Sequence, residues 1–182
     1  MEQRLQAELE VKIDPEISDE EVDRLWNLYE AAFKRIASHN PCRQYYHERD
    51  FKEALRNPEY SLIIAYDSGA PVFFCMLTQN FGVIPWIAPE FFDEHYPDSV
   101  GRRTYIPVIF VNVRNQGMHH FRTMMLAIQD YMEERSIKYA FYDHGAEGPN
   151  KFLAQMIVAT PRSDGHPIGT QVYEVAWTIP EE

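Results

Sequence analysis

The stretch that decides the fold covers residues 105–142, which read YIPVIFVNV, RNQG, MHHFRTMMLAIQDYMEERS and IKYAFY in succession. An apolar run passes through a short polar turn at 114–117 into a long amphipathic segment, and a second apolar run follows at once. This order predicts a strand, a helix and a parallel strand joined by a right-handed crossover. A helix start has free backbone N–H groups and the positive end of its dipole, so the turn is a predicted anion site.

Composition limits the class of protein. The chain has 182 residues, of which 45% are apolar and 14% aromatic, which is typical of one folded domain with a core. The net charge of −11 argues against nonspecific nucleic-acid binding, because a duplex binder usually carries a basic face. A local basic groove stays open as an alternative, around Arg102, Arg103, Arg114 and Arg122.

Compartment signals are few. The two cysteines, Cys42 and Cys75, have neither a metal-ligand nor a CxxC spacing, so we expect free thiols in a reducing cytoplasm. The amino-terminal residues MEQRLQAELEV lack the apolar core of a signal peptide. No apolar run approaches the roughly 20 residues that a membrane span needs. We therefore expect a soluble, cytoplasmic protein without membrane partners.

Regular patterns predict the remaining elements. Ser18 and Glu21 form a capping box, and apolar side chains then recur every three or four residues, which indicates a helix that ends before Pro41. The polar segment 67–69 between two apolar runs indicates a β-hairpin. The predicted order is strand 6–13, helix 18 to about 37–40, helix 47–56, strands 61–66 and 71–79, a turn or two of helix at 89–95, strand 104–113, helix 117–135, strand 138–142, helix 148–158 and strand 171–179.

This order predicts an α+β fold with one mixed central β-sheet flanked by helices. Residues 80–103 are aromatic and proline-rich and show no clear period. A segment of this length inside a compact domain is usually functional or partly helical. We expect a single domain over residues 1–182, with 80–103 as an insert.

The element order and the strand-to-helix turn together resemble the GNAT superfamily of acyl-CoA N-acyltransferases. In that family the central strand ends in a turn written R/Q-x-x-G-x-G/A. Residues 114–119 (RNQGMH) match the Arg and the first Gly, whereas His119 stands where Gly or Ala is usual. The resemblance covers roughly residues 6–179 by element order and implies a GNAT-like domain. The imidazole implies that coenzyme A sits differently, that His119 turns aside, or that the site no longer binds coenzyme A. The alternative reading of the turn is an ordinary helix start.

The resemblance implies a site for acetyl-CoA or another acyl-CoA as cosubstrate. The end of the central strand would pair with the pantetheine arm, the amides of about 116–120 would face the pyrophosphate, and Arg122 would add charge unless it is a solvated surface side chain. Asn150 falls where the family has an Asn, but the family's tyrosine acid seven residues later is Ile157 here. The cofactor-binding residues implied in this way are Val111, Asn112, Val113, Arg114, Gln116, Gly117, Met118, His119, His120, Arg122 and Asn150.

Candidate acid–base residues follow the crossover. Asp143 and His144 come directly after the strand at 138–142, at the strand edge where ligands of open α/β sheets gather. Amine acylation needs a base, and His or a carboxylate suits that role. Tyr173 and Tyr142 are the nearest phenols by element. The alternatives are a capping Asp, a solvent-exposed His and two packing tyrosines.

The resemblance also implies that the two early helices and the loop between them line the acceptor pocket. Tyr45, Tyr46 and His47 would then contact the acceptor substrate, and Trp86 of the insert could cover it. The insert could equally provide packing or the surface of a homodimer. No metal is expected, because the adjacent His119 and His120 lack a partner at helical ligand spacing.

The resemblance implies an N-acyltransferase that moves an acyl group, expected to be acetyl, to a small-molecule or protein amine by direct attack. This mechanism needs positioning and an oxyanion donor rather than a nucleophilic side chain. Two alternatives stay open. One is a noncatalytic GNAT-like module that has lost coenzyme A use and binds a protein or small ligand. The other is a GNAT-like enzyme acting on a nucleobase or nucleic acid, with stacking by the insert, although the acidic charge counts against it.

The turn can be tested by a pair of substitutions. If coenzyme A binds at the turn, Gly117→Val abolishes binding because the added side chain crowds the phosphate, whereas His119→Gly keeps or improves the affinity. Calorimetric titration with acetyl-CoA measures both, with thermal unfolding as the control for folding. Loss of activity in a well-folded His119→Gly variant would instead make the imidazole a participant.

Overall fold

A mixed β-sheet forms the centre of the computed structural model, which describes residues 9–38 and 45–143. Within these residues the sheet has five strands in the order β1-β2-β3-β4-β5. The pairs from β1 to β4 are antiparallel, and β5 runs parallel to β4. The strands are β1 (Glu10–Ile13), β2 (Ser61–Asp67), β3 (Ala70–Thr78), β4 (Arg103–Val111) and β5 (Tyr139–Tyr142).

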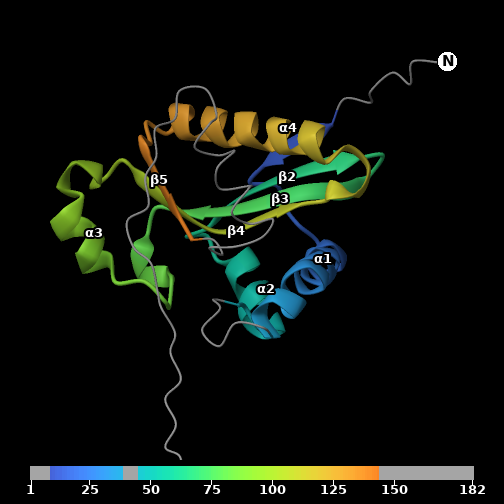
Figure 1. Ribbon diagram of the computed structural model, residues 1–182, viewed down its shortest axis with the longest axis horizontal. Helices are drawn as coiled ribbons and strands as arrows, with labels where there is room; N and C mark the ends of the chain where they lie inside the picture. The colour runs from blue at the N-terminus through green and yellow to red at the C-terminus, as the bar shows by residue number, and fades with distance from the viewer. Residues whose placement is uncertain (1–8, 39–44, 144–182) are drawn as a thin grey trace, which may run out of the picture. The chain divides into compact units, whose positions relative to one another are not determined.

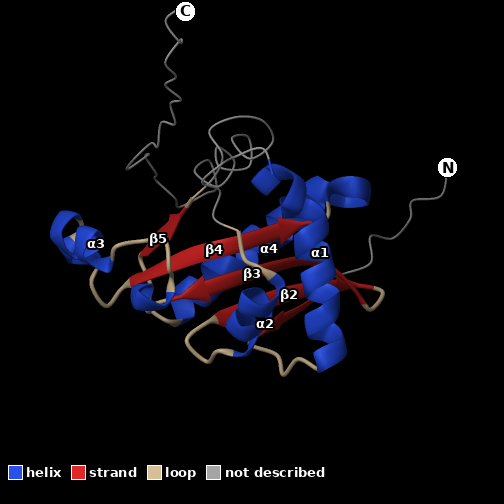
Figure 2. Ribbon diagram, turned by 90° about the horizontal axis from the view of Figure 1, so that it is seen from below, coloured by secondary structure: helices blue, strands red, loops and turns tan. Residues whose placement is uncertain are grey.

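Helices cover both faces of the sheet (Figure 1). The helix α4 (Val113–Glu134) lies on one face, where the Tyr131 hydroxyl donates to Ser61 Oγ of β2 at 2.8 Å. The helices α1 (Asp19–Ser38) and α2 (Glu48–Arg56) lie on the other face, in front of the strands in Figure 2. None of the helices in the described part of the chain has the length and apolar character that a membrane span requires.

The hairpin between β2 and β3 turns at Ser68 and Gly69, as the sequence predicts. Both residues have positive φ angles, of 52° and 78°, and the flanking pair is Asp67 and Ala70. This is the type I′ geometry, whose twist matches that of the two strands. Glycine adopts the second of these conformations at no steric cost, which explains Gly69.

The α1–α2 face carries an aromatic core. Phe74 of β3 is fully buried, and its ring stacks on that of Phe110 of β4 with centroids 5.1 Å apart. Phe51 of α2 stacks on Tyr29 of α1 at 4.6 Å. The buried residues of this core are Leu25, Trp26, Tyr29, Tyr46, Phe51, Ala54, Leu62, Ile64, Phe74, Met76, Val108 and Phe110.

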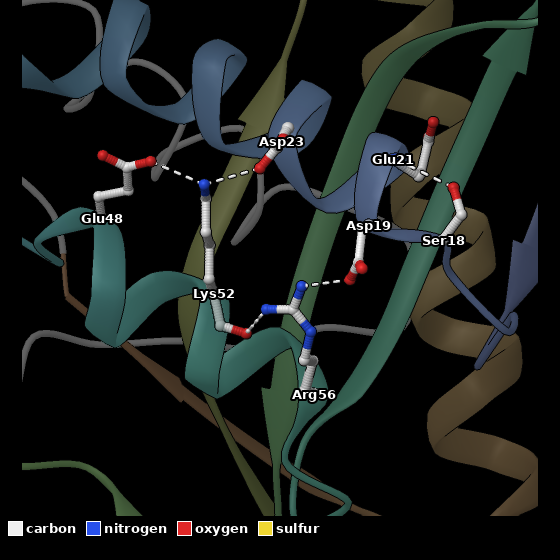
Figure 3. Close-up of polar contacts among 7 residues, drawn as sticks. All are labelled: Ser18, Asp19, Glu21, Asp23, Glu48, Lys52 and Arg56. Atoms are coloured by element: carbon white, nitrogen blue, oxygen red, sulfur yellow. Dashed lines mark hydrogen bonds and ion pairs between the residues drawn. The ribbon is translucent and has the colours of Figure 1, made fainter.

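Polar contacts hold α1 and α2 in place (Figure 3). The backbone N–H of Glu21 donates to Ser18 Oγ at 3.2 Å, which is the predicted N-cap of α1. Lys52 Nζ lies 2.7 Å from a carboxylate oxygen of both Asp23 and Glu48, and Arg56 reaches Asp19 at 2.7 Å. The Lys52–Asp23 and Arg56–Asp19 pairs join α2 to α1, whereas the Lys52–Glu48 pair lies within α2. Exposed pairs of this kind contribute little energy each.

The insert between β3 and β4 contains α3 (Pro89–His95), which confirms the short helix predicted at 89–95. Single 3-10 turns flank α3 at Phe81–Val83 and Pro97–Ser99. Two arginines hold the insert to the start of β4. Arg103 pairs with Asp93 at 2.6 Å and lies over the Phe81 ring at 4.3 Å, while Arg102 donates to the Asp98 carbonyl at 2.7 Å.

One predicted boundary is wrong. The helix expected at 117–135 begins at Val113, so the residues 114–117 belong to its first turns rather than to a separate turn. A glycine inside a helix costs only about 1 kcal/mol relative to alanine, and burial of one helix face outweighs that cost. The buried residues of α4 include Phe121, Met124, Ile128 and Tyr131.

Other predicted elements lie outside the described residues. They are the start of the strand predicted at 6–13, the helix at 148–158 and the strand at 171–179. The single domain expected over residues 1–182 therefore stays a prediction.

The aromatic core yields a stability prediction. We expect Phe74→Ala to lower the free energy of unfolding by about 3–5 kcal/mol, because it leaves a cavity in the centre of the sheet. The matched change Leu126→Ala, at a side chain that is 49% exposed, should cost within about 0.5 kcal/mol. Urea unfolding followed by circular dichroism measures both, and equal losses would contradict this description of the core.

Candidate functional site

A β-bulge in β4 shapes the candidate site. Val108 lies opposite Met76 and Tyr105 lies opposite Thr78, so a step of three residues on β4 matches a step of two on β3. Ile106 and Pro107 together therefore take the place of a single residue of a regular strand. Bulges bend a strand and are frequent next to functional sites.

The parallel ladder between β4 and β5 ends at the bulge. Its last pair is Ile106 with Tyr142, whereas β4 continues to Val111. We call this place, where β4 continues without β5, the fork. Pro107 has no N–H group, so it cannot extend the ladder.

Beyond the bulge, β4 has an open edge. The N–H of Asn112 donates to the Val72 carbonyl of β3 at 2.8 Å. Because successive residues direct their N–H and C=O groups to opposite sides of a strand, Ile109 and Val111 direct theirs away from β3. Within residues 9–38 and 45–143, no strand pairs with these groups. The fork therefore leaves main-chain donors and acceptors of β4 available to a ligand.

The start of α4 lies at the end of this open edge. The first amides of a helix have no acceptor inside it, and Asn112 already donates to β3. The open amides are therefore those of Val113, Arg114 and Asn115. The amides of 116–120, which the resemblance implies for the pyrophosphate, lie deeper in the helix, and their part in binding an anion stays a prediction.

His120 packs under the helix start. Its side chain is 3% exposed, and Nδ1 lies 3.2 Å from the Asn112 carbonyl oxygen. A carbonyl only accepts, so Nδ1 donates in this bond. His120 therefore supports the strand-to-helix junction, and Arg122 on the same helix is exposed.

On the α1–α2 side of the fork, Tyr105 contacts the predicted catalytic Asp143. The Tyr105 hydroxyl donates to Asp143 Oδ1 at 2.7 Å, and Trp86 Nε1 donates to the Tyr105 oxygen at 3.4 Å. Burial raises the pKa of the Tyr105 phenol, and the Asp143 carboxylate raises that pKa further. Tyr105 therefore stays protonated at neutral pH and acts as a donor.

Two further tyrosines, Tyr46 and Tyr60, extend the contacts of Trp86. The Tyr46 ring meets the Trp86 ring edge-on at 5.1 Å, and the Tyr46 and Tyr60 hydroxyl oxygens are 3.4 Å apart. Tyr60 donates to the Val83 carbonyl at 3.1 Å, so its oxygen is the acceptor for Tyr46. Burial raises the pKa of Tyr46, which keeps its phenol neutral. Tyr46, Tyr60, Trp86 and Tyr105 thus form one polar aromatic group, which we call the tyrosine cluster.

The structure brings only part of the predicted site together. Asp143 and the backbone of Val111, Asn112 and Val113 lie at the fork, and Trp86 and Tyr46 reach Asp143 through Tyr105. Tyr45 instead stacks on Tyr29 of α1 at 5.4 Å, with His47 5.9 Å from it at the start of α2. The backbones of Arg114, Gln116, Gly117, Met118 and His119 lie on α4, but their side chains are outside the described part, as are His144, Asn150 and Tyr173 altogether.

Sequence reasoning missed Tyr105 and Tyr60. Tyr105 reads as an ordinary strand residue, and its contact with Asp143 depends on the bulge. Pro107 is the signal that could have found it, since a proline inside an apolar run indicates a bulge or an edge. Among the described residues no group of three or more His, Cys, Asp or Glu is placed to hold a metal ion.

Comparison with solved structures gives the class of fold. No family model and no curated protein matches the sequence. A ribosomal-protein-alanine N-acetyltransferase from Brucella melitensis biovar Abortus 2308 is similar at a TM-score of 0.59 and 11% identity, over 93% of this chain and 100% of that one. A possible acetyltransferase from Clostridium difficile 630 gives 0.59 and 13%, over 93% and 99%. The enzyme AAC(6')-Iy, in complex with the bisubstrate analog CoA-S-monomethyl-acetylneamine, gives 0.56 and 11%, over 93% and 100%.

These likenesses span nearly the whole of each chain, while the identities are low. They confirm the architecture that the element order and the strand-to-helix junction predict. The protein has the α+β fold of the GNAT superfamily, in a divergent sequence.

Proposed function

We propose that the protein is an N-acetyltransferase, which moves the acetyl group of acetyl-CoA to an amine that binds beside Asp143. The observation that carries this proposal is the fork, where an open edge of β4, a helix start and a carboxylate lie next to one another. The names of the similar structures, which are acetyltransferases, support the same reaction class.

The residues at the fork fit coenzyme A. Its pantetheine arm carries amide groups, which can pair with an open strand edge as an added strand does, here with Ile109 and Val111. Its pyrophosphate is an anion, and the amides at the start of α4 form an anion site. Arg122, exposed on α4, can add positive charge. Nothing in this arrangement requires a particular side chain at the strand edge.

The chemistry needs few side chains. Bound acetyl-CoA supplies a thioester carbonyl, at which a C–N bond to the amine forms and the C–S bond breaks, while the ammonium loses one proton to a base and one to the departing thiolate. Asp143 is the described carboxylate that can take the first proton. A backbone N–H of β4 can polarise the carbonyl oxygen. His144 and Tyr173 stay predictions for the remaining acid–base work.

The acceptor is proposed only by class, as a small-molecule or protein amine. Tyr46 and Trp86 remain its proposed contacts, because the tyrosine cluster lies on the same side of β4 as Asp143. Tyr45 and His47 remain proposed as more distant contacts at the start of α2. The arginines that an enzyme acting on nucleic acid would use are engaged, since Arg102 and Arg103 hold the insert.

Acetyl-CoA binding is the direct test. At a hundred times its dissociation constant, acetyl-CoA should raise the free energy of unfolding by about 2.7 kcal/mol. Thermal unfolding with increasing acetyl-CoA measures the change, and ADP, which lacks the pantetheine arm, should stabilise less. No change at millimolar acetyl-CoA would favour the noncatalytic binding module.

The open strand edge can be tested at Val111. Val111→Pro removes an N–H that faces the fork and leaves the ladder with β3 intact, so acetyl-CoA affinity should fall by about threefold to tenfold. The control Val111→Ala keeps the N–H and should bind as the original chain does. Calorimetric titration compares them, and equal affinities for the two variants would contradict pairing at this edge.

A further inference from the structure

Three side chains at the fork form a chain of hydrogen bonds with a fixed direction. An indole N–H can only donate, so Trp86 donates to the Tyr105 oxygen, and the single phenolic hydrogen of Tyr105 is left for Asp143. The bond to Asp143 is the shorter of the two, at 2.7 Å against 3.4 Å. A hydrogen bond to a charged group is stronger than one between neutral groups.

The donor in this chain is held rigidly. Tyr105 is 4% exposed, and its ring meets that of Phe81 edge-on at 5.8 Å. The bulge at Ile106 and Pro107 turns Tyr105 toward the α1–α2 side, the same side as Val108. The Trp86 ring is in turn held against Tyr46.

The acceptor end of the chain is different, because Asp143 is exposed and follows β5 directly at the fork. An exposed carboxylate on a loop ordinarily samples several rotamers. The bond from a buried phenol selects one of them and occupies Oδ1. Among the described residues no donor reaches Oδ2.

We propose that Tyr105, itself held by Trp86, is a positioning residue that orients Asp143 so that Oδ2 receives the ammonium group of a cationic amine acceptor. This inference rests on the proposed acetyl transfer and adds a specificity to it, namely for acceptors that approach as alkylammonium ions. Asp143 is the group that contacts the ammonium of the acceptor, and Tyr105 acts through Asp143 alone.

The test compares Tyr105→Phe, Asp143→Asn and the double variant, with Tyr139→Phe on β5 as the matched control. Release of free thiol from acetyl-CoA is followed with putrescine, phenethylamine and trialanine as acceptors. We expect Tyr105→Phe to lower kcat/KM for the amine about tenfold, and Asp143→Asn to lower it further, with KM for acetyl-CoA within about twofold. The double variant should match Asp143→Asn alone, because the two residues act as one unit.

Three results would overturn the inference. Tyr105→Phe could match Tyr139→Phe, or the two losses could add in the double variant. The variants could also shift KM for acetyl-CoA as much as that for the amine, which would indicate a structural role.

A binding measurement separates this inference from the proposed function. Saturation-transfer NMR with the same three amines needs neither acetyl-CoA nor turnover. Binding to the original chain that is lost in Asp143→Asn and weakened in Tyr105→Phe supports the inference, even if acetyl-CoA produces no stabilisation and acetyl transfer fails. Absence of binding to the original chain, or equal binding to all variants, overturns the inference while leaving acetyl-CoA binding to be judged by thermal unfolding.

Discussion

The bulge at Ile106 and Pro107 is the constraint on which the rest of the site depends. The extra residue ends the ladder between β4 and β5 and leaves the main-chain groups of Ile109 and Val111 open. It also reverses the face of the sheet on which the side chains before the bulge lie, and so brings Tyr105 beside Trp86 and Asp143. In a regular β4, Tyr105 would face the side opposite to Val108, away from Trp86 and Asp143, because neighbouring residues of a strand alternate between its faces.

A site built from main-chain groups tolerates sequence change. Every residue except proline carries an N–H and a C=O, so the open edge of β4 and the start of α4 survive substitution of their side chains. The solved structures with this fold are 11–13% identical to the chain, which fits such tolerance. In the proposed reaction, the choice of acceptor therefore rests on side chains around the fork, namely those of the tyrosine cluster and Asp143. A shared fold alone does not identify the acceptor.

Local patterns were sufficient for several elements. The cap at Ser18, the turn at Ser68 and Gly69 and the short helix at 89–95 all depend on contacts between residues close in sequence. The start of α4 was placed too late because a glycine at 117 reads as a turn when the packing of the whole helix is unknown. Asp143 was predicted from its place after a strand, but its partner Tyr105 was missed. The two residues are 38 positions apart, and a bulge in β4, the strand that carries Tyr105, brings them together.

The sequence by itself determined the order of elements and the presence of a helix directly after the central strand, because periodicity and capping act within a few residues. It also determined the type of fold, through the resemblance that this order carries. Only the tertiary structure decided where β4 parts from β5, which amides stay open and which phenol meets Asp143. These features depend on strand register and on side-chain packing between distant segments, and no local pattern encodes either.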